Sequence, residues 1–385
     1  MIKAPFNFVP LAANVFYPDW AHLVSHDIPF KDSLSGTIHV TICAETPVFI
    51  RNGHVQGIED NEFSYYLENG KRRYFIPGSS VKGCIRNVLE IMSFGKMQPI
   101  TNSHTDKNYK HSPQDLEKMR QEDSASIQEQ DADSIDLAEC IFGRVSKDDS
   151  LCGRVQFSHF KCTNVVQMPD ASKSFTIVLG TPNPAVLPLY VSQDGERYID
   201  YDEKNKYPDE ILNGWKRYIL RSGYWTKKPG KDNVTTTFKP LNKGTVFKGD
   251  IHYHNLKKEE LGALLCALTW HNESDCFHQI GLAKPFGFGR VHVSIDDDST
   301  KKTSEYIPYF EQLMTPWIRK MFQDDNYTWR RNWVIKELFT LAKTIRRWDD
   351  KKFYYMEGKE SKTAKKNHEY LYRLSKLLKE ENNQD

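Results

Sequence analysis

Residues 74–97, YFIPGSSVKGCIRNVLEIMSFGKM, contain the most regular helical pattern in the chain. Pro77 and Gly78 predict a turn, and the serine that follows, Ser79 or Ser80, is suited to cap a helix. Gly95 is suited to end that helix. Apolar side chains recur at the spacing of one helical face, at Val81, Ile85, Val88, Leu89 and Met92. The stretch therefore predicts an amphipathic helix with one face against a core.

The elements on either side of this helix predict the fold class. Alternating, β-branched residues at 35–50 predict a strand before it, and 153–161 predict a strand after it. The pattern then repeats: a strand at 245–256, a leucine-rich helix capped by Asn255, and a strand at 289–295. Strand–helix–strand occurring twice predicts an α+β protein with a ferredoxin-like (RRM-like) split βαβ core.

Composition changes along the chain predict its organisation. Residues 1–34 form an N-terminal extended segment, 35–300 form the ferredoxin-like domain, and 301–385 form a C-terminal helical extension. Two long insertions interrupt the domain. The first, at about 97–136, is acidic and poor in large apolar residues, and the second, at 163–245, is aromatic, basic and punctuated by prolines, which predicts extended hairpins.

Overall charge and cysteine use limit the functional classes. The chain of 385 residues carries a net charge of only +2, so binding to a polyanion requires local basic clusters. No apolar stretch approaches the ~18 residues of a membrane span, and the N-terminus lacks a signal-peptide pattern. Seven cysteines without a C-x-x-C motif predict reduced thiols in a cytoplasmic protein with no membrane contact.

A loosely spaced group of metal-ligating residues could form a zinc site. Its members are Cys140, Cys152, His159 and Cys162. The alternative is that they are small buried residues on strands.

The predicted helix also carries a candidate phosphate site. Lys82 and Arg86 are four residues apart, on one face and away from the apolar stripe. They lie in the first turns, where free backbone N–H groups and the helix dipole favour an anion, and Ser79 and Ser80 add hydroxyl donors. The alternative is the solvated polar face of an ordinary amphipathic helix.

A glycine-rich loop, IGLAKPFGFGRVHV at 280–293, is the second candidate site. It matches neither the dinucleotide nor the P-loop fingerprint. Its glycines allow a close approach to a ligand, its phenylalanines can stack on bases, and its cations can bind phosphates. The alternative is a tight loop whose phenylalanines belong to the core. Together with the helix, the loop predicts binding of single-stranded nucleic acid through Gly281, Lys284, Phe286, Gly287, Phe288, Gly289 and Arg290.

Three stretches carry a resemblance to a known family. IPGSSVKGCIR, IFGRVSKDDSLCGRVQFSHF and IGLAKPFGFGRV resemble, in the same order, three motifs of the RAMP superfamily of CRISPR proteins. Ile141 stands where the family has Leu, and His159 where it has Asp. The N-terminal residues resemble a RAMP variant of type III-D and related systems. The resemblance covers roughly residues 5–295 and leaves the tail beyond 305 unexplained.

The resemblance implies a backbone subunit of an RNA-guided CRISPR effector complex, which acts in antiviral defence. Its implied partners are a guide RNA, a target RNA, further copies of itself or other RAMP subunits, and a large subunit or separate nuclease. Ser79, Ser80, Lys82 and Arg86 would hold guide phosphates. The insertion at 163–245 would supply a thumb between guide and target, and the insertion at 97–136 a lid.

The resemblance also raises the question of catalysis. Active members of the family cut target RNA with an aspartate in the loop after the first strand and a divalent metal. The corresponding loop, RNGHVQGIEDNEF, offers Asp60 first, then Glu59 and Glu62, with Mg²⁺ or Mn²⁺ as the cofactor. Asp27 is another candidate. The competing interpretation, which we favour, is a solvated acidic loop in an architectural subunit.

Two further functions remain open. His252 and His254, at i and i+2 of a strand, would serve a metal-independent ribonuclease that processes guide RNA. A stand-alone ferredoxin-like RNA-binding module is the other alternative, and the missing aromatic signature of RRM domains counts against it.

Overall fold

The main sheet has the ferredoxin-like order that the sequence predicts. The computed structural model describes residues 4–12, 14–53, 61–97, 134–145, 150–168, 174–179, 213–225, 235–344 and 358–376, together with Leu189 and Phe353. The four core positions are filled by β2 (Leu34–Ala44), by β7 (Val155–Phe157) with β8 (Phe160–Asn164), by β12 (Val246–Leu256), and by β14 (Arg290–Ile295). They pair antiparallel in the spatial order β14–β2–β12–β8, so the fourth strand lies beside the first and the third beside both the first and the second.

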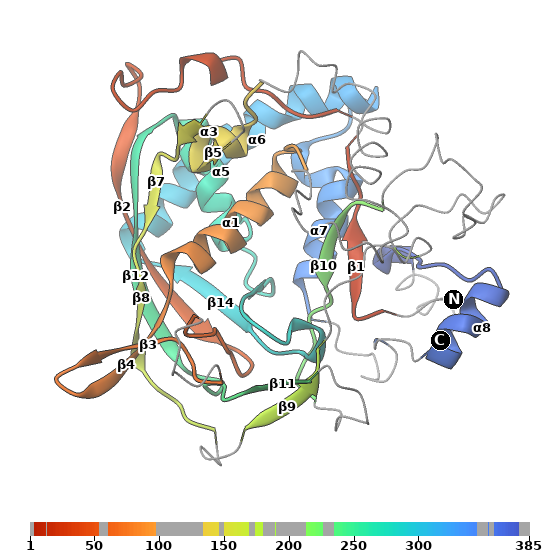
Figure 1. Cartoon of the computed structure of the whole chain (residues 1–385). Coiled ribbons are helices and arrows are strands. Elements are labelled where there is room, and N and C mark those ends of the chain that lie inside the picture. The colour runs from red at the N-terminus through yellow and green to blue at the C-terminus, as the bar shows by residue number, and fades with distance from the viewer. Residues whose placement is uncertain are drawn as a thin grey trace.

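Two helices cover one face of this sheet (Figure 1). They are α1 (Gly78–Met92) and α5 (Lys258–Thr269). Alternate residues of β2 face them, and Ile38, Val40 and Ile42 are at most 1% exposed. The intervening residues, such as His39, face the opposite side and are more exposed. The period-two pattern of the sequence therefore divides the sheet into a core face and an outer face.

The apolar stripe of α1 is confirmed, whereas its predicted ends are not. All five stripe residues are buried. Pro77 is the N-cap residue and makes no side-chain cap, so Ser79 and Ser80 lie inside the first turn. The helix ends at Met92, before Gly95. Gly78 is needed for close packing, because a Cβ there would lie 2.2 Å from the carbonyl oxygen of Phe157.

The start of α5 also differs from the prediction. Lys257 is the N-cap, and Glu260 accepts a hydrogen bond from its backbone N–H at 2.8 Å. Asn255 has a positive φ of 55° in the irregular end of β12. Its side chain binds the N-terminal segment instead, through the Phe30 N–H and the Ser25 carbonyl. A polar residue near a helix start therefore serves a long-range contact here.

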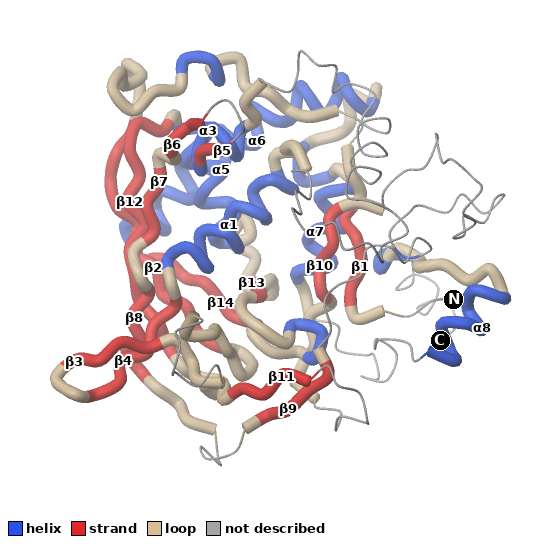
Figure 2. Tube along the Cα trace, in the orientation of Figure 1, coloured by secondary structure: helices blue, strands red, loops and turns tan. Residues whose placement is uncertain are grey.

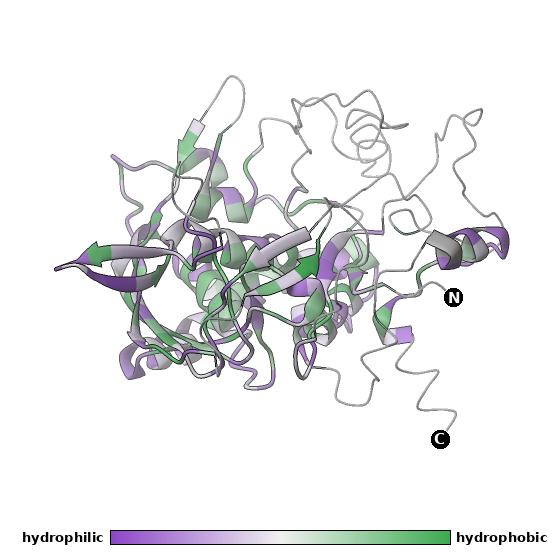
Figure 3. Cartoon of the chain, turned by 60° about the horizontal axis from the view of Figure 1, so that its bottom comes forward, coloured by the Kyte–Doolittle hydropathy of each residue, from purple (hydrophilic) through white to green (hydrophobic). Residues whose placement is uncertain are grey.

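Shorter elements extend the sheet and close its edges. The turn at Asn69 and Gly70 joins two strands into a hairpin, which projects from the body of the molecule (Figures 1 and 3). The elements are β3 (Tyr65–Glu68), β4 (Lys71–Ile76), α3 (Leu137–Phe142), β5 (Gly143–Val145), β6 (Ser150–Cys152), β13 (His278–Gln279) and the 3-10 helix η3 (Lys284–Phe286).

The described parts of the second insertion return to the body of the protein. β10 (Trp215–Tyr218) pairs with the N-terminal strand β1 (Phe6–Val9), and β9 (Phe175–Val178) pairs with β11 (Thr235–Phe238) (Figure 2). Most of the predicted lid, residues 98–133, lies outside the described residues, as does the rest of the predicted thumb.

The C-terminal extension packs on the helices of the core. It comprises α6 (Asp297–Phe322), the 3-10 helix η4 (Trp329–Arg331), α7 (Trp333–Ala342) and α8 (Gly358–Lys366), while a short 3-10 helix, η1 (Ala21–Leu23), lies near the N-terminus. Trp329 is fully buried, and its indole N–H donates to the carbonyl of Met92 at the end of α1. Within the described residues, none of the helices combines the length and apolar content needed to span a bilayer.

Candidate nucleic-acid interface

The polar face of α1 is open to solvent and carries the predicted cradle. Ser79 and Gly83 are exposed, while Lys82 and Arg86 are half-buried at one edge of this face. Arg86 donates from Nε to Glu90 at 2.7 Å and from Nη1 to the carbonyl of Gly143 at 2.9 Å. Its Nη2 is buried without a hydrogen-bond partner in the described part of the chain. Arg86 is therefore held in place and keeps one donor unused.

Lys82 is the less committed of the two cations. Its ammonium lies 3.1 Å from the place a Cβ on Gly153 would occupy, and no ion pair or hydrogen bond engages it among the described residues. Burial, together with the charge of Arg86, lowers the pKa of Lys82. A half-buried ammonium without a counter-ion gains stability when an anion binds beside it. This edge of α1 is therefore suited to a phosphate.

The aromatic residues of the glycine loop belong to the core, which corrects the predicted stacking role. Phe288 is fully buried and its ring contacts those of Phe175, Tyr224 and Phe238. Phe286 is 5% exposed and packs against Trp225. Strands from the second insertion cover the loop, so neither ring faces solvent. The alternative interpretation of the loop is the one the structure supports.

The loop glycines are required by the protein's own backbone. A Cβ on Gly287 would lie 2.2 Å from the carbonyl oxygen of Gly223, and one on Gly289 only 1.9 Å from that of Ile280. Both have positive φ. Gly281 is crowded in the same way. These glycines allow close packing between segments rather than the approach of a ligand.

The two cations of the loop have different environments. Arg290 is buried, and its guanidinium donates to the carbonyl of Arg221, so it ties the loop to the second insertion. The ammonium of Lys284, in contrast, makes no hydrogen bond or ion pair within the described residues. It lies close enough to Arg217 and Cys84 for electrostatic interaction. Only Lys284 of the loop remains a candidate phosphate ligand.

Arg217 was not identified from the sequence. It lies on β10, and its Nη1 donates to the side-chain oxygen of Asn87 on α1 at 2.9 Å. Its guanidinium also lies 5.7 Å from the ring centre of Trp270. The basic and aromatic run WKRY was visible in the second insertion, but nothing in the sequence places it beside α1.

The predicted catalytic loop, residues 51–63, is described only at its two ends, 51–53 and 61–63. Asp60 and Glu59 lie outside the described residues. Glu62 is engaged by Arg72 at 3.2 Å and by Lys239 at 3.0 Å, beneath the β3–β4 hairpin. Both partners neutralise its carboxylate, so Glu62 is poorly suited to bind a metal ion. Asp27 is exposed, and its backbone N–H donates a hydrogen bond to the hydroxyl oxygen of Ser25.

The predicted zinc ligands do not assemble. Cys140 is buried in α3, Cys152 is exposed on β6, and Cys162 lies on β8. His159 accepts a hydrogen bond from the N–H of Gly78, so this departure from the family pattern anchors the start of α1. Within the described residues, the only group of three at ligand distance is Glu273, Asp275 and Cys276, where Arg330 and Lys343 already bind the carboxylates.

The two strand histidines lie on the outer face of the sheet. His252 pairs with the hydroxyl of Thr37 at 2.9 Å, and His254 with that of Ser35 at 3.3 Å. His254 also stacks on His26. Their side-chain partners are hydroxyls from β2, and this face is separated by the sheet from α1.

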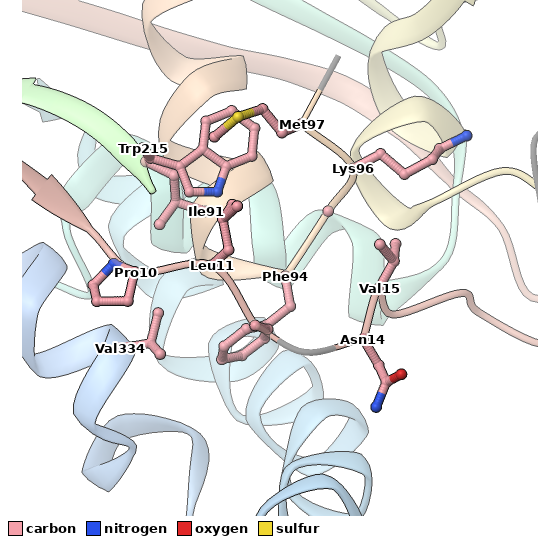
Figure 4. Close-up of a pocket in the computed structure, with 12 residues that line it drawn as sticks. Pro10, Leu11, Asn14, Val15, Ile91, Phe94, Lys96, Met97, Trp215 and Val334 are labelled. Atoms are coloured by element: carbon pink, nitrogen blue, oxygen red, sulfur yellow. The ribbon is translucent and has the colours of Figure 1, made fainter. Parts of the chain in front are cut away.

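A small hollow at the far end of α1 has a different character (Figure 4). Leu11, Phe94, Trp215 and Val334 supply its mainly apolar lining, and its volume is about 30 Å³. Ligand pockets for small molecules are typically at least about ten times larger. The hollow is therefore not a nucleotide site.

Comparison with protein families bears out the predicted family. The family model of the RAMP superfamily matches residues 41–292, which run from β2 to β14. No curated protein matches the sequence. Among solved structures, the chain is similar to one described as "Type IV-B CRISPR Complex", with 14% sequence identity and a TM-score of 0.33, covering 68% of this chain and 91% of that chain. A similarity at this level carries no argument about function.

Proposed function

This chain belongs to the RAMP superfamily, and from that premise we propose that it is a subunit of a CRISPR effector complex that holds guide RNA by its phosphates along the open face of α1. The observation that carries the proposal is the cationic edge of α1. There, the Lys82 ammonium and the Nη2 of Arg86 have no partner among the described residues. Lys82 is the fifth residue of α1 and Arg86 the ninth, so the attraction for a phosphate comes from their own charges and not from the helix dipole, which fades after the first turn.

The chemistry of this face suits recognition of a backbone rather than of bases. Phosphate contacts position a strand without reading its sequence. Phe286 and Phe288, which the sequence assigned to base stacking, are buried, and the polar groups near Lys82 and Arg86 are hydroxyls, an amide and cations. A subunit that must accept guides of different sequence needs this kind of surface.

The wider assembly follows from the same proposal. Further copies of the chain or other RAMP subunits would continue the binding surface along the guide, and a complementary target RNA would pair with it. A large subunit or a separate nuclease would complete the complex. The chain then acts mainly as an architectural subunit that presents target RNA.

Target cleavage by this chain is the competing version of the proposal. It would require Asp60, with Glu59, to hold Mg²⁺ or Mn²⁺ at the target phosphodiester. Guide-loaded complexes should then cut target RNA at regular spacing only when the metal is present. Asp60→Ala should abolish cutting and leave target affinity unchanged. Tight target binding without cutting at any metal concentration supports the architectural role.

The cradle is tested by the salt dependence of RNA binding. The variant Lys82→Gln/Arg86→Gln removes two phosphate ligands, so the slope of log affinity against log salt should become shallower by about 1.4, at about 0.7 per single-strand phosphate. Affinity for polyuridylate should fall at every salt concentration.

A matched control removes the same charge elsewhere. Lys301 and Lys320 are exposed on α6, so Lys301→Gln/Lys320→Gln should leave the slope unchanged. Equal slopes and affinities for the cradle variant and this control would exclude the cradle.

A further inference from the structure

Two cations from other elements, Arg217 of β10 and Lys284 of η3, lie beside α1 near Asn87 and Cys84. We propose that Lys284 and Arg217 form a second phosphate subsite, so that one RNA strand crosses α1 over Gly83 and contacts both edges of the helix. This inference rests on the proposed function. It adds Arg217 of the second insertion to the proposed binding surface and defines the path of the strand across the helix.

The two cations of the proposed subsite lie near each other and near few other titratable groups of the described residues. Lys284 and Arg217 interact electrostatically, and the nearby titratable groups are Cys84, a thiol, and His278. Burial lowers the pKa of His278 to about 3, so this imidazole is neutral. No carboxylate in the described part of the chain pairs with either cation. Two neighbouring cations away from bulk water repel each other, and an anion between them removes that cost.

Two contacts hold Arg217 in position for such a role. The hydrogen bond to Asn87 and the contact with the Trp270 ring orient the guanidinium. The pairing of β1 with β10 sets Arg217 opposite Asn7 and so fixes the strand beside α1. The fork of donors on Arg217 is thus pre-arranged, as phosphate binding requires.

Helix geometry places the two subsites on opposite sides of one open track. Successive residues of a helix turn by about 100°, so Lys82 and Cys84 point to opposite edges, with Gly83 between them. Gly83 is exposed, and a Cβ there would meet no atom of the described residues within 4 Å. The track is therefore low and unobstructed at its centre. A helix is about 10–12 Å wide, which corresponds to about three stacked nucleotides.

Two native cysteines allow the subsites to be monitored separately. Cys152 is close enough to Lys82, and Cys84 to Lys284 and Arg217, for electrostatic interaction. Cys43 lies on the outer face of the sheet and serves as an internal control. The experiment measures the alkylation rate of each cysteine by mass spectrometry, with and without polyuridylate. We expect RNA to slow alkylation of Cys152 and Cys84 and to leave that of Cys43 unchanged.

Variants assign the protection of Cys84 to the two cations. Lys284→Gln/Arg217→Gln should lose that protection and keep the protection of Cys152. Arg217→Lys retains the charge and should keep both. Thermal melting of each variant identifies a folding defect. If a variant is misfolded, the test rests on whether polyuridylate slows alkylation of Cys84 in the wild-type protein.

The outcomes separate this inference from the proposed function. Protection of Cys152 with an unchanged Cys84 rate would exclude the second subsite and leave the cradle intact. Protection of neither cysteine would overturn both. Equal protection of Cys84 by inorganic phosphate at the same phosphate concentration would show a small-anion site and would contradict a crossing RNA strand.

Discussion

Glu90→Gln should make the protein more stable at alkaline pH and leave its stability at acidic pH unchanged. Glu90 lies on α1 with its side chain largely buried, beside Arg86 and near the carboxyl groups of Asp136 and Glu139. Burial raises the pKa of Glu90 from 4.5 to about 7, against the opposing effect of the Arg86 hydrogen bond. The folded protein therefore holds a proton at Glu90 in a pH range where the unfolded chain has lost it.

The size of the effect follows from this difference in pKa. Between 4.5 and about 7 the unfolded state binds fewer protons, so stability falls as pH rises through this window. At about 1.4 kcal/mol per pH unit, the full loss is about 3 kcal/mol. Glutamine resembles the protonated carboxyl group and can still accept the bond from Arg86. The variant should therefore match the wild type near pH ~4, below both pKa values, and exceed it by up to about 3 kcal/mol near pH ~8.

The assay is urea unfolding of both proteins across this pH range. Glu68→Gln is the control, because Glu68 is an exposed partner of Arg73 on the projecting hairpin and its loss should have little effect at any pH. If Glu90→Gln is less stable than the wild type near pH 8, the ion pair with Arg86 outweighs burial and the reasoning is refuted. A difference that does not change with pH would refute it as well.

The other predictions concern packing, a buried ion pair and RNA binding. Gly83→Ala, on the exposed side of α1, should raise the free energy of unfolding by about 0.5–1 kcal/mol. Gly153→Ala should lower it by about 1–3 kcal/mol, because the new Cβ would lie 2.4 Å from the carbonyl oxygen of Phe142. Thermal melting curves of the two variants test both values. Glu260→Gln leaves the buried guanidinium of Arg154 without its counter-charge and should cost about 3–5 kcal/mol in denaturant unfolding. The pKa of Lys82 is lowered from 10.5, so Lys82 should lose its charge at a lower pH than the exposed lysines do. Affinity for polyuridylate, measured by fluorescence anisotropy, should therefore begin to decline before the exposed lysines titrate. Lys82→Gln should remove that early part of the decline.

The order of elements in the core could be predicted from the sequence because hydrophobic periodicity is a local property. The two strand–helix–strand units and the apolar stripe of α1 both follow from the spacing of neighbouring apolar residues. The predicted cap of α5 was wrong because it depends on contacts between residues far apart in the sequence. Asn255 is a good capping residue by type, but its side chain is taken by the N-terminal segment, which lies far away in sequence.

The candidate site divides in the same way. Lys82 and Arg86 could be paired from the sequence, because residues four apart share a helical face. The roles of Phe286 and Phe288 could not be assigned, because the same residues suit a stacking loop or a core, and the choice depends on whether another segment covers them.

Arg217 shows most clearly what only the tertiary structure decides. It is separated from α1 by more than a hundred residues, and the pairing of β10 with the N-terminal strand brings it to Asn87 and Lys284. A sequence records which charges exist and which of them share a helix or a strand. Which cations are left without a counter-charge depends on long-range packing, and here that packing brings Arg217 and Lys284 beside α1.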